Sequence, residues 1–249
     1  MQEKISTVVH EFKSISLEEM NTVALMKRTD TKYVIPFSLL KKILSEVVDD
    51  YSVLEIDDKR IMNYSSVYFD TEDYKFYNDH HNGKTNRTKI RQRKYVDSDL
   101  TFLEIKKKNG KGETNKSRIK IDDFDLKLSQ NAKDFIKNKT KQDFNLTPTL
   151  WNNFYRVTLV SLKNKERVTI DLDLNYTIDN EEKSYKKLVV VEVKQEKFDR
   201  SSAIVQALKK HHNNPYSISK YCIGMVNLYD NLKSNLFKRK VLKINKISA

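Results

Sequence analysis

The chain has 249 residues, of which 38% are hydrophobic and 33% are charged, and its formal net charge is +13 at pH 7. This length and the high aromatic content exclude a disordered chain and allow one large β-rich domain or two small ones. The basic excess favours an anionic partner, such as nucleic acid, a phosphorylated small molecule, polyphosphate or a membrane surface.

Cys222 is the single cysteine, which excludes an intrachain disulfide and a cysteine-based zinc site and fits a reducing cytosol. The first residues, MQEKISTVVHEF, lack the apolar run of a signal peptide. The longest apolar run, Leu188–Val191, is far too short to cross a bilayer. We therefore expect a cytoplasmic protein without a membrane span.

Apolar spacing and turn residues predict alternating helices and strands in the first third of the chain. In order, the predicted elements are a short helix within residues 1–25, a strand over 28–36 that Pro36 ends, a helix from 37 to about 50, strand structure over 51–69, and a polar helical turn and loop over 73–86.

The stretch Thr88–Ile121 predicts three strands joined by two short turns, with charge at alternate positions. Successive strand residues point to opposite sides, so each set of charges lines one face of the sheet. The three sets are Lys89, Arg91 and Arg93; Phe102, Glu104 and Lys106; and Lys116, Arg118 and Lys120.

The remaining elements also alternate between helix and strand. In order, we predict a helix around 134–141, a stop at Pro148, a strand over 151–162 and a turn at Asn164 and Lys165. Two strands follow, one with Arg167, Thr169, Asp171 and Asp173 on one face and one over 188–194. The chain then forms a helix that Ser201 caps and that ends near Lys210, a last helix over about 224–236, and a frayed basic tail over 237–249.

The charged strand faces have two interpretations. A single such face usually lies in solvent, but here six strands repeat the pattern, and basic residues dominate over isolated carboxylates. If the faces point inward, they line a basic interior suited to phosphate oxygens, and amphipathic helices must cover the apolar outer side. We therefore expect an α+β fold, an antiparallel and about eight-stranded closed β-barrel with helices packed outside.

Nine segments in order resemble the polyphosphate polymerase domain of the vacuolar transporter chaperone (VTC) family, within the triphosphate tunnel metalloenzymes. The segments are RTDTKYVIP (28–36), SSVYFDTEDY (65–74), KIRQRKY (89–95), FLEIKKK (102–108), NKSRIKI (115–121), FYRVTL (154–159), ERVTIDLDL (166–174), VVVEVK (189–194) and PYSISKY (215–221). The resemblance covers about residues 20–228 and implies one tunnel domain over 1–249 that transfers the γ-phosphoryl group of ATP to a growing polyphosphate chain.

The resemblance also implies roles for individual residues. The phosphate-contacting and catalytic positions would be Lys32, Arg91, Arg93, Lys106, Lys116, Arg118, Arg156, Arg167, Lys194 and Lys220. Within this set ATP would contact Lys32, Arg91, Arg93, Arg118, Arg156 and Lys220, together with Ser219. A divalent metal, Mn²⁺ or Mg²⁺, would bind Glu192 with help from Glu104.

One departure affects the metal and the choice of reaction. The wider superfamily opens with Glu-x-Glu-x-Lys, whereas this chain has Arg28, Asp30 and Lys32 at those positions. The lost carboxylate shifts metal binding towards Glu192 and removes a candidate base for water. Two alternatives to a polymerase stay open: a tripolyphosphatase or nucleoside triphosphatase on the same fold, and a non-catalytic polyanion or nucleic-acid binder. We expect no specific nucleic-acid partner, and a peripheral membrane or protein contact through the basic tail is a further option.

Overall fold

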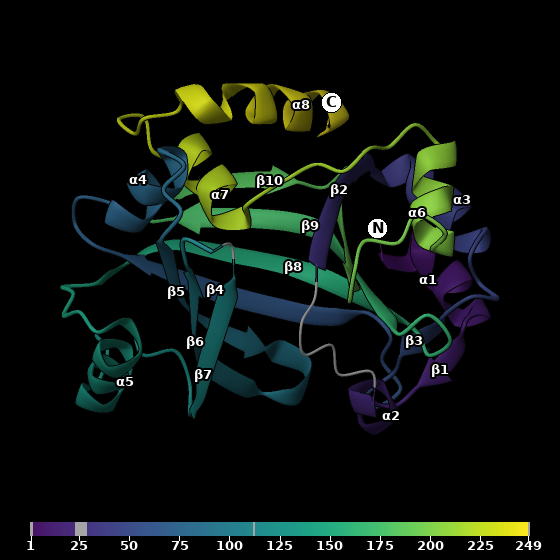
Figure 1. The fold of residues 1–249 in the computed structure, drawn as a ribbon, viewed down its shortest axis with the longest axis horizontal. Coiled ribbons are helices and arrows are strands. Elements are labelled where there is room, and N and C mark those ends of the chain that lie inside the picture. The colour runs from purple at the N-terminus through teal and green to yellow at the C-terminus, as the bar shows by residue number, and fades with distance from the viewer. Residues whose placement is uncertain (1, 23–28, 112, 249) are drawn as a thin grey trace.

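A computed structural model describes residues 2–22, 29–111 and 113–248 (Figure 1). Arg28, expected on the first strand, and Gly112, expected in a turn, lie outside these residues. The strands are β1 (Lys13–Ile15), β2 (Thr29–Pro36), β3 (Ser52–Leu54), β4 (Met62–Asp70), β5 (Arg87–Tyr95), β6 (Leu100–Lys108), β7 (Thr114–Ile121), β8 (Thr147–Ser161), β9 (Glu166–Ile178), β10 (Glu181–Tyr185) and β11 (Leu188–Gln195). The α-helices are α1 (Gln2–Glu11), α2 (Leu17–Thr22), α3 (Phe37–Ser45), α4 (Lys75–His81), α5 (Gln130–Thr140), α6 (Ala203–Lys210), α7 (Lys220–Leu228) and α8 (Lys238–Ser248), and short 3₁₀ turns are η1 (Val96–Ser98) and η2 (Asn235–Phe237).

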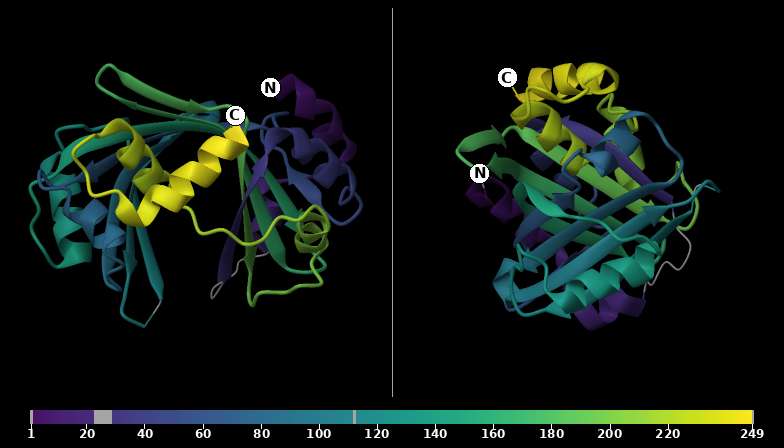
Figure 2. Two further views of the ribbon diagram at one scale, coloured as in Figure 1. Left: turned by 90° about the horizontal axis from the view of Figure 1, so that it is seen from above. Right: turned by 90° about the vertical axis from the view of Figure 1, so that its left-hand side faces the viewer.

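The strands form one mostly antiparallel sheet, as expected for an α+β fold. Eight of them follow the order β2-β11-β9-β8-β4-β5-β6-β7, while β1, β3 and β10 attach beside this path. The expected closure into a barrel is not found in the strand pairing: β2 and β7 stand at the ends of the path, and within the described residues each pairs with a single strand. The sheet instead bends into an arch, seen from above in Figure 2.

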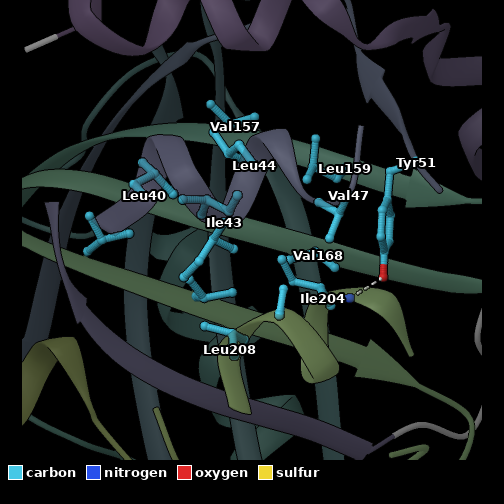
Figure 3. Packing of buried hydrophobic residues seen from close by; sticks show 14 of the residues in the cluster. Leu40, Ile43, Leu44, Val47, Tyr51, Val157, Leu159, Val168, Ile204 and Leu208 are labelled. Atoms are coloured by element: carbon cyan, nitrogen blue, oxygen red, sulfur yellow. Dashed lines mark hydrogen bonds between the residues drawn. The ribbon is translucent and has the colours of Figure 1, made fainter. Parts of the chain in front are cut away.

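Helices cover the outer side of the arch, as its apolar outer face requires. On one arm, α1, α3 and α6 pack on β2, β8, β9 and β11. Figure 3 shows this core, in which Leu40, Ile43 and Leu44 of α3 meet Val157 of β8 and Leu208 of α6. On the other arm, Ile136 of α5 belongs to a separate cluster with the outer faces of β4, β5 and β6.

One end of the inner side is filled by packed apolar residues. The helix α7 brings Tyr221, Cys222 and Met225 against Leu150 of β8 and Tyr176 of β9, and α8 lies over α7 (Figure 1). The approach of α7 to the sheet is close, because a Cβ on Gly224 would lie 2.4 Å from a Leu150 methyl group and 2.6 Å from the Tyr176 ring. The charged residues therefore occupy only the other part of the inner side.

Several predicted elements differ from those observed. The short helix predicted within 1–25 is α1, but the same region also contains the strand β1 and the helix α2, because Ile15 pairs with Leu54 in a parallel ladder. The strand β8 begins at Thr147 and includes Pro148, since a proline is tolerated near the start of a strand. The helix α3 ends at Ser45 rather than near 50, and the strand structure predicted over 51–69 consists of two strands, β3 and β4.

The C-terminal part differs more. The strand β10 was not predicted, and the helix expected over 224–236 is α7, which starts at Lys220 because the Ser219 hydroxyl accepts the Cys222 amide at 3.3 Å. The N-cap of α6 is Ser202 rather than Ser201. The expected frayed tail is instead the helix α8, since Phe237 and Ile244 are buried against the α7 cluster. No helix in the described ranges is both long and apolar enough to cross a membrane.

Candidate functional site

The charged residues of seven strands converge on the inner side of the arch. Their strand neighbours Ile35, Ile90 and Ile170 belong to the apolar clusters of the outer side, so alternation directs the charges inward. This arrangement agrees with the inward interpretation of the sequence pattern. The inner charged set consists of Asp30, Lys32, Lys89, Arg91, Arg93, Glu104, Lys106, Lys116, Arg118, Arg156, Asp171, Glu192 and Lys194.

Asp171 forms ion pairs with two of the basic residues that were expected to contact phosphate, Arg156 and Lys220. Its carboxylate accepts Nε of Arg156 at 2.5 Å and Nη2 at 2.8 Å, and it also accepts the ammonium of Lys220 from α7. Asp171 is 2% exposed. Burial alone would raise the pKa of this carboxyl, but the charges of Arg156 and Lys220 hold the pKa well below its usual range. The Arg156 guanidinium lies over the Tyr64 ring at 5.0 Å, which fixes its plane.

Glu192 forms a second group with two lysines. In the ladders it stands opposite Lys32 of β2 and Thr169 of β9. Its carboxylate accepts the Lys32 ammonium and lies 3.4 Å from Nζ of Lys194, which also donates to Thr169 Oγ1 at 3.1 Å. Burial lowers the pKa of Lys194 to about 7, although the Glu192 charge opposes this shift. The nearby Lys194 and Lys32 outweigh burial and keep the pKa of Glu192 well below its usual value.

Glu104 forms the third group, on the opposite arm. Its Oε2 accepts Nε of Arg91 at 2.7 Å and lies 2.6 Å from Nη2, while Nη1 of Arg91 is 3.3 Å from the Tyr68 hydroxyl. Burial would raise the pKa of Glu104, but Arg91 and Arg93 lower it to about 2. This carboxylate is therefore ionised at neutral pH and orients Arg91.

Four further cations of the inner charged set have no carboxylate within ion-pair distance among the described residues: Lys89, Arg93, Lys106 and, on the end strand, Arg118. Lys89 donates to the Ser219 hydroxyl at 2.8 Å, and Arg93 lies 3.4 Å from Ser66 Oγ. Partial burial of the ammonium group is the main reason that the pKa of Lys106 is lowered to about 8, and repulsion from Lys116, Lys32 and Lys89 adds to this effect. These groups repel one another unless an anion lies between them, so they form a basic inner surface that suits phosphate oxygens.

The remaining expected site residues lie at the margins of this surface. Lys116 and Arg118 are exposed on the end strand β7, and the Arg118 guanidinium is 4.7 Å from the centroid of the Phe102 ring. Arg167 is directed elsewhere, since its Nη2 donates to the Met20 carbonyl of α2 at 3.4 Å. Ser219 caps α7 and contacts Lys89, so it joins that helix to the basic inner surface.

The residue-by-residue resemblance left out several contributors to the site. Lys89 begins the KIRQRKY segment and alternates with Arg91, but the resemblance gave a role only to the two arginines of that segment. Asp171 was recognisable only as a member of a charged strand face, and its partner Lys220 comes from a helix 49 residues later. Tyr64 and Tyr68, which contact the arginines, had no sequence signal at all, because a tyrosine in a strand usually belongs to the core.

The side chains of this site can hold a divalent metal only together with a bound phosphate group. No group of three or more His, Cys, Asp or Glu side chains that could hold an ion occurs among the described residues. Glu192 and Glu104 each already neutralise basic side chains. The donor set therefore does not fit an all-protein cage, but it fits an ion held mainly by phosphate oxygens with one carboxylate oxygen from the chain, as Mg²⁺ is commonly bound.

Comparison with protein families decides the assignment. The model of the VTC domain matches residues 27–229. The chain belongs to the VTC domain family. A search of curated proteins found no match for this VTC domain.

One solved structure shows a similar fold. The VTC domain is similar to a putative adenylyl cyclase from Hippeastrum, described as having a dominant triphosphatase activity, with a TM-score of 0.50, 13% identity, and coverage of 84% of this chain and 99% of that chain. A Pyrococcus horikoshii protein (TM-score 0.39, 13% identity, 74% and 88% coverage) and the S. pombe RNA triphosphatase Pct1 (TM-score 0.30, 11% identity, 99% and 90% coverage) are more distant. The expected membership of the VTC family is confirmed.

Proposed function

We propose that this VTC domain is an ATP-dependent polyphosphate polymerase, which transfers the γ-phosphoryl group of ATP to the end of a polyphosphate chain. The carrying observation is the convergence of Lys89, Arg93 and Lys106, without carboxylate partners within the described residues, between three groups of ion-paired bases. An interior with this excess of positive charge suits a substrate with several phosphates in a row. The VTC family match supports the same substrate class.

Phosphoryl transfer requires mainly positioning and charge stabilisation, since the transition state spreads negative charge over the equatorial oxygens. Arg91 and Arg156 are held in fixed planes by Glu104 and Asp171, so they can present their remaining N–H groups to phosphate without reorganising. We assign ATP to Lys32, Arg91, Arg93, Arg118, Arg156, Ser219 and Lys220. The acceptor chain is assigned to three further bases of the inner side, namely Lys106, Lys116 and Lys194.

A Mn²⁺ or Mg²⁺ ion would enter with the triphosphate, and we propose Glu192 as its carboxylate ligand, with Glu104 assisting. When bound, the ion neutralises charge on the phosphate oxygens. We further propose that the chain acts as one domain over 1–249, with its core over about 20–228. We place it in the reducing cytosol, in keeping with the free thiol of the buried Cys222.

One observation favours a second candidate function, the hydrolysis of a triphosphate. The solved structure at TM-score 0.50 belongs to a protein described as a dominant triphosphatase, and the same bases would hold a triphosphate for attack by water. Only the acceptor differs between the two reactions. The residues that bind phosphate therefore cannot distinguish them, and product analysis has to.

The test uses purified chain with ATP and Mn²⁺, with and without a short polyphosphate primer, and separates the products on a gel. Long polyphosphate supports the polymerase, whereas orthophosphate alone identifies a hydrolase. Arg91→Ala and Glu192→Gln should each lower the synthesis rate by about 10²–10³-fold, the usual effect of losing one transition-state contact. The matched control for Arg91→Ala is Lys94→Ala. This variant removes a cation from the outer face of β5, the strand that carries Arg91, where Lys94 pairs with Asp99 and Asp123. If the control loses as much activity as Arg91→Ala, the assignment of the inner face is wrong.

A further inference from the structure

The helix α8 and the turn η2 before it present a basic outer face with exposed leucines. From residue 231 to 248 the sequence contains six cations, Lys233, Lys238, Arg239, Lys240, Lys243 and Lys246, and no Asp or Glu. The proposed reaction uses none of them. This concentration of positive charge lies on the outermost element of its side of the molecule (Figures 1 and 2).

The apolar face of α8 is already occupied by the protein. Phe237 and Ile244 are 5% and 0% exposed, and Val241 and Ile247 pack against the same cluster as α7. This packing fixes the rotation of the helix, so the opposite side of α8 faces solvent. The helix is therefore attached through one face and presents the other.

The outward face combines charge with apolar groups. Lys238, Arg239 and Lys246 are exposed, and between them Leu242 is 60% exposed. Leu236, just before the helix, is 63% exposed, and these two leucines are the most exposed large hydrophobic side chains in the described ranges. A solvated helix face has no need for either leucine.

We propose that this α8 basic face, formed by Leu236, Lys238, Arg239, Leu242 and Lys246, docks on an anionic lipid surface. Clustered cations are attracted to the negative potential of such a surface. The leucines decide between lipid and a soluble polyanion, because a bilayer interface offers an apolar phase for their side chains and a polyphosphate or nucleic-acid chain does not. Since α8 follows α7, docking would place the bilayer on the side of the molecule that carries Lys220.

The test measures cosedimentation of the full chain with phosphatidylcholine vesicles, with and without about one third phosphatidylglycerol. We expect binding only to the anionic vesicles. The variant Lys238→Glu/Arg239→Glu/Lys246→Glu should bind them at least roughly 100-fold more weakly, at about fivefold per cation.

A matched control changes the net charge equally on another helix and its preceding loop. The variant Lys127→Glu/Lys133→Glu/Lys139→Glu alters three exposed lysines around α5, including one in its last turn, as Lys246 is in α8. We expect this control to bind anionic vesicles within a few-fold of the wild type. Equal losses in the two triple variants would mean that overall charge, rather than the α8 basic face, governs binding and would overturn the proposal.

The leucines supply the second test. Leu236→Ser/Leu242→Ser should weaken vesicle binding but leave binding to a free polyphosphate chain unchanged, and both side chains are too exposed for the fold to depend on them. If this variant binds vesicles like the wild type, the face is a general polyanion surface and lipid docking is wrong. The absence of wild-type binding to anionic vesicles would also overturn it. None of these measurements depends on polymerase activity.

Discussion

Asp171 of β9 and Arg156 of β8 stand opposite each other in the antiparallel ladder, and two hydrogen bonds of 2.5 and 2.8 Å join carboxylate to guanidinium. The same carboxylate holds Lys220 at the start of α7. One buried acid thus fixes two of the proposed phosphate contacts and ties a helix to the inner side of the sheet. Asp171 is a positioning residue in this arrangement.

The first prediction concerns this acid. Asp171→Asn leaves two buried cations without their partner, and breaking a buried ion pair from one side costs about 3–5 kcal/mol of unfolding free energy. Denaturant unfolding measures this loss. Synthesis at saturating ATP should fall by at least about tenfold, since Arg156 loses its fixed plane. The control is Asp173→Asn, two residues along the same strand, where a φ of 50° suits asparagine and the carboxylate forms no ion pair with any described residue. Similar losses in both variants would show that Asp171 has no special role.

The second prediction concerns Lys106. Its ammonium lies on the inner face among Lys116, Lys32 and Lys89, whereas Lys107, next in sequence, points outward and donates to the carbonyls of Lys139 and Thr140 at 3.3 Å. Lys106→Ala should weaken tripolyphosphate binding by about tenfold or more, because it removes a charge-assisted contact. Lys107→Ala should leave the dissociation constant within about twofold. Isothermal titration calorimetry of both variants checks this, and equal effects would contradict the orientation of β6.

The third prediction is a pH dependence from Lys194, whose pKa is about 7 in the folded chain. An unfolded lysine has a pKa of about 10.4. Between these values the unfolded chain binds one more proton, so the free energy of unfolding should rise with pH, and below about pH 7 the destabilisation is complete and constant. From about pH 7 to 9 the wild type should gain roughly 2 kcal/mol relative to Lys194→Met. Parallel unfolding curves for the two proteins across this range would contradict the lowered pKa.

The fourth prediction concerns the contact between α7 and the sheet. Gly224→Ala places a Cβ within 2.6 Å of atoms of Leu150 and Tyr176, so overpacking should lower the free energy of unfolding by about 1–3 kcal/mol. The displaced helix carries Lys220, so ATP binding should weaken as well. Gly110→Ala is the control, because its added Cβ would meet nothing closer than 3.9 Å. Thermal unfolding of the two variants gives the comparison, and a neutral Gly224→Ala would mean that α7 does not seat closely.

How far the site could be predicted from the sequence is clearest for Arg91 and Arg93. Alternation in a strand is a local property, so the sequence alone placed both on one face with Lys89 and opposite Ile90, and the structure agrees. The order of nine motifs likewise sufficed for the VTC family. The turn at Lys165, whose φ is 48°, could also be predicted, because a turn depends on neighbouring residues alone.

Only the tertiary structure decided which acid neutralises which base. Asp171 and Lys220 are far apart in sequence, and the pairing depends on how α7 crosses the sheet. Closure of the sheet could not be predicted from the sequence either. The number of strands suggested a barrel, but twist and curvature accumulate over the whole sheet. Among the described residues β2 and β7 form no backbone pairing, and their contact is through side chains, with Nζ of Lys116 3.8 Å from the Asp30 carboxylate. A sequence specifies which side of each strand is charged because that depends on neighbours, whereas partners across the sheet depend on the summed geometry of every strand between them.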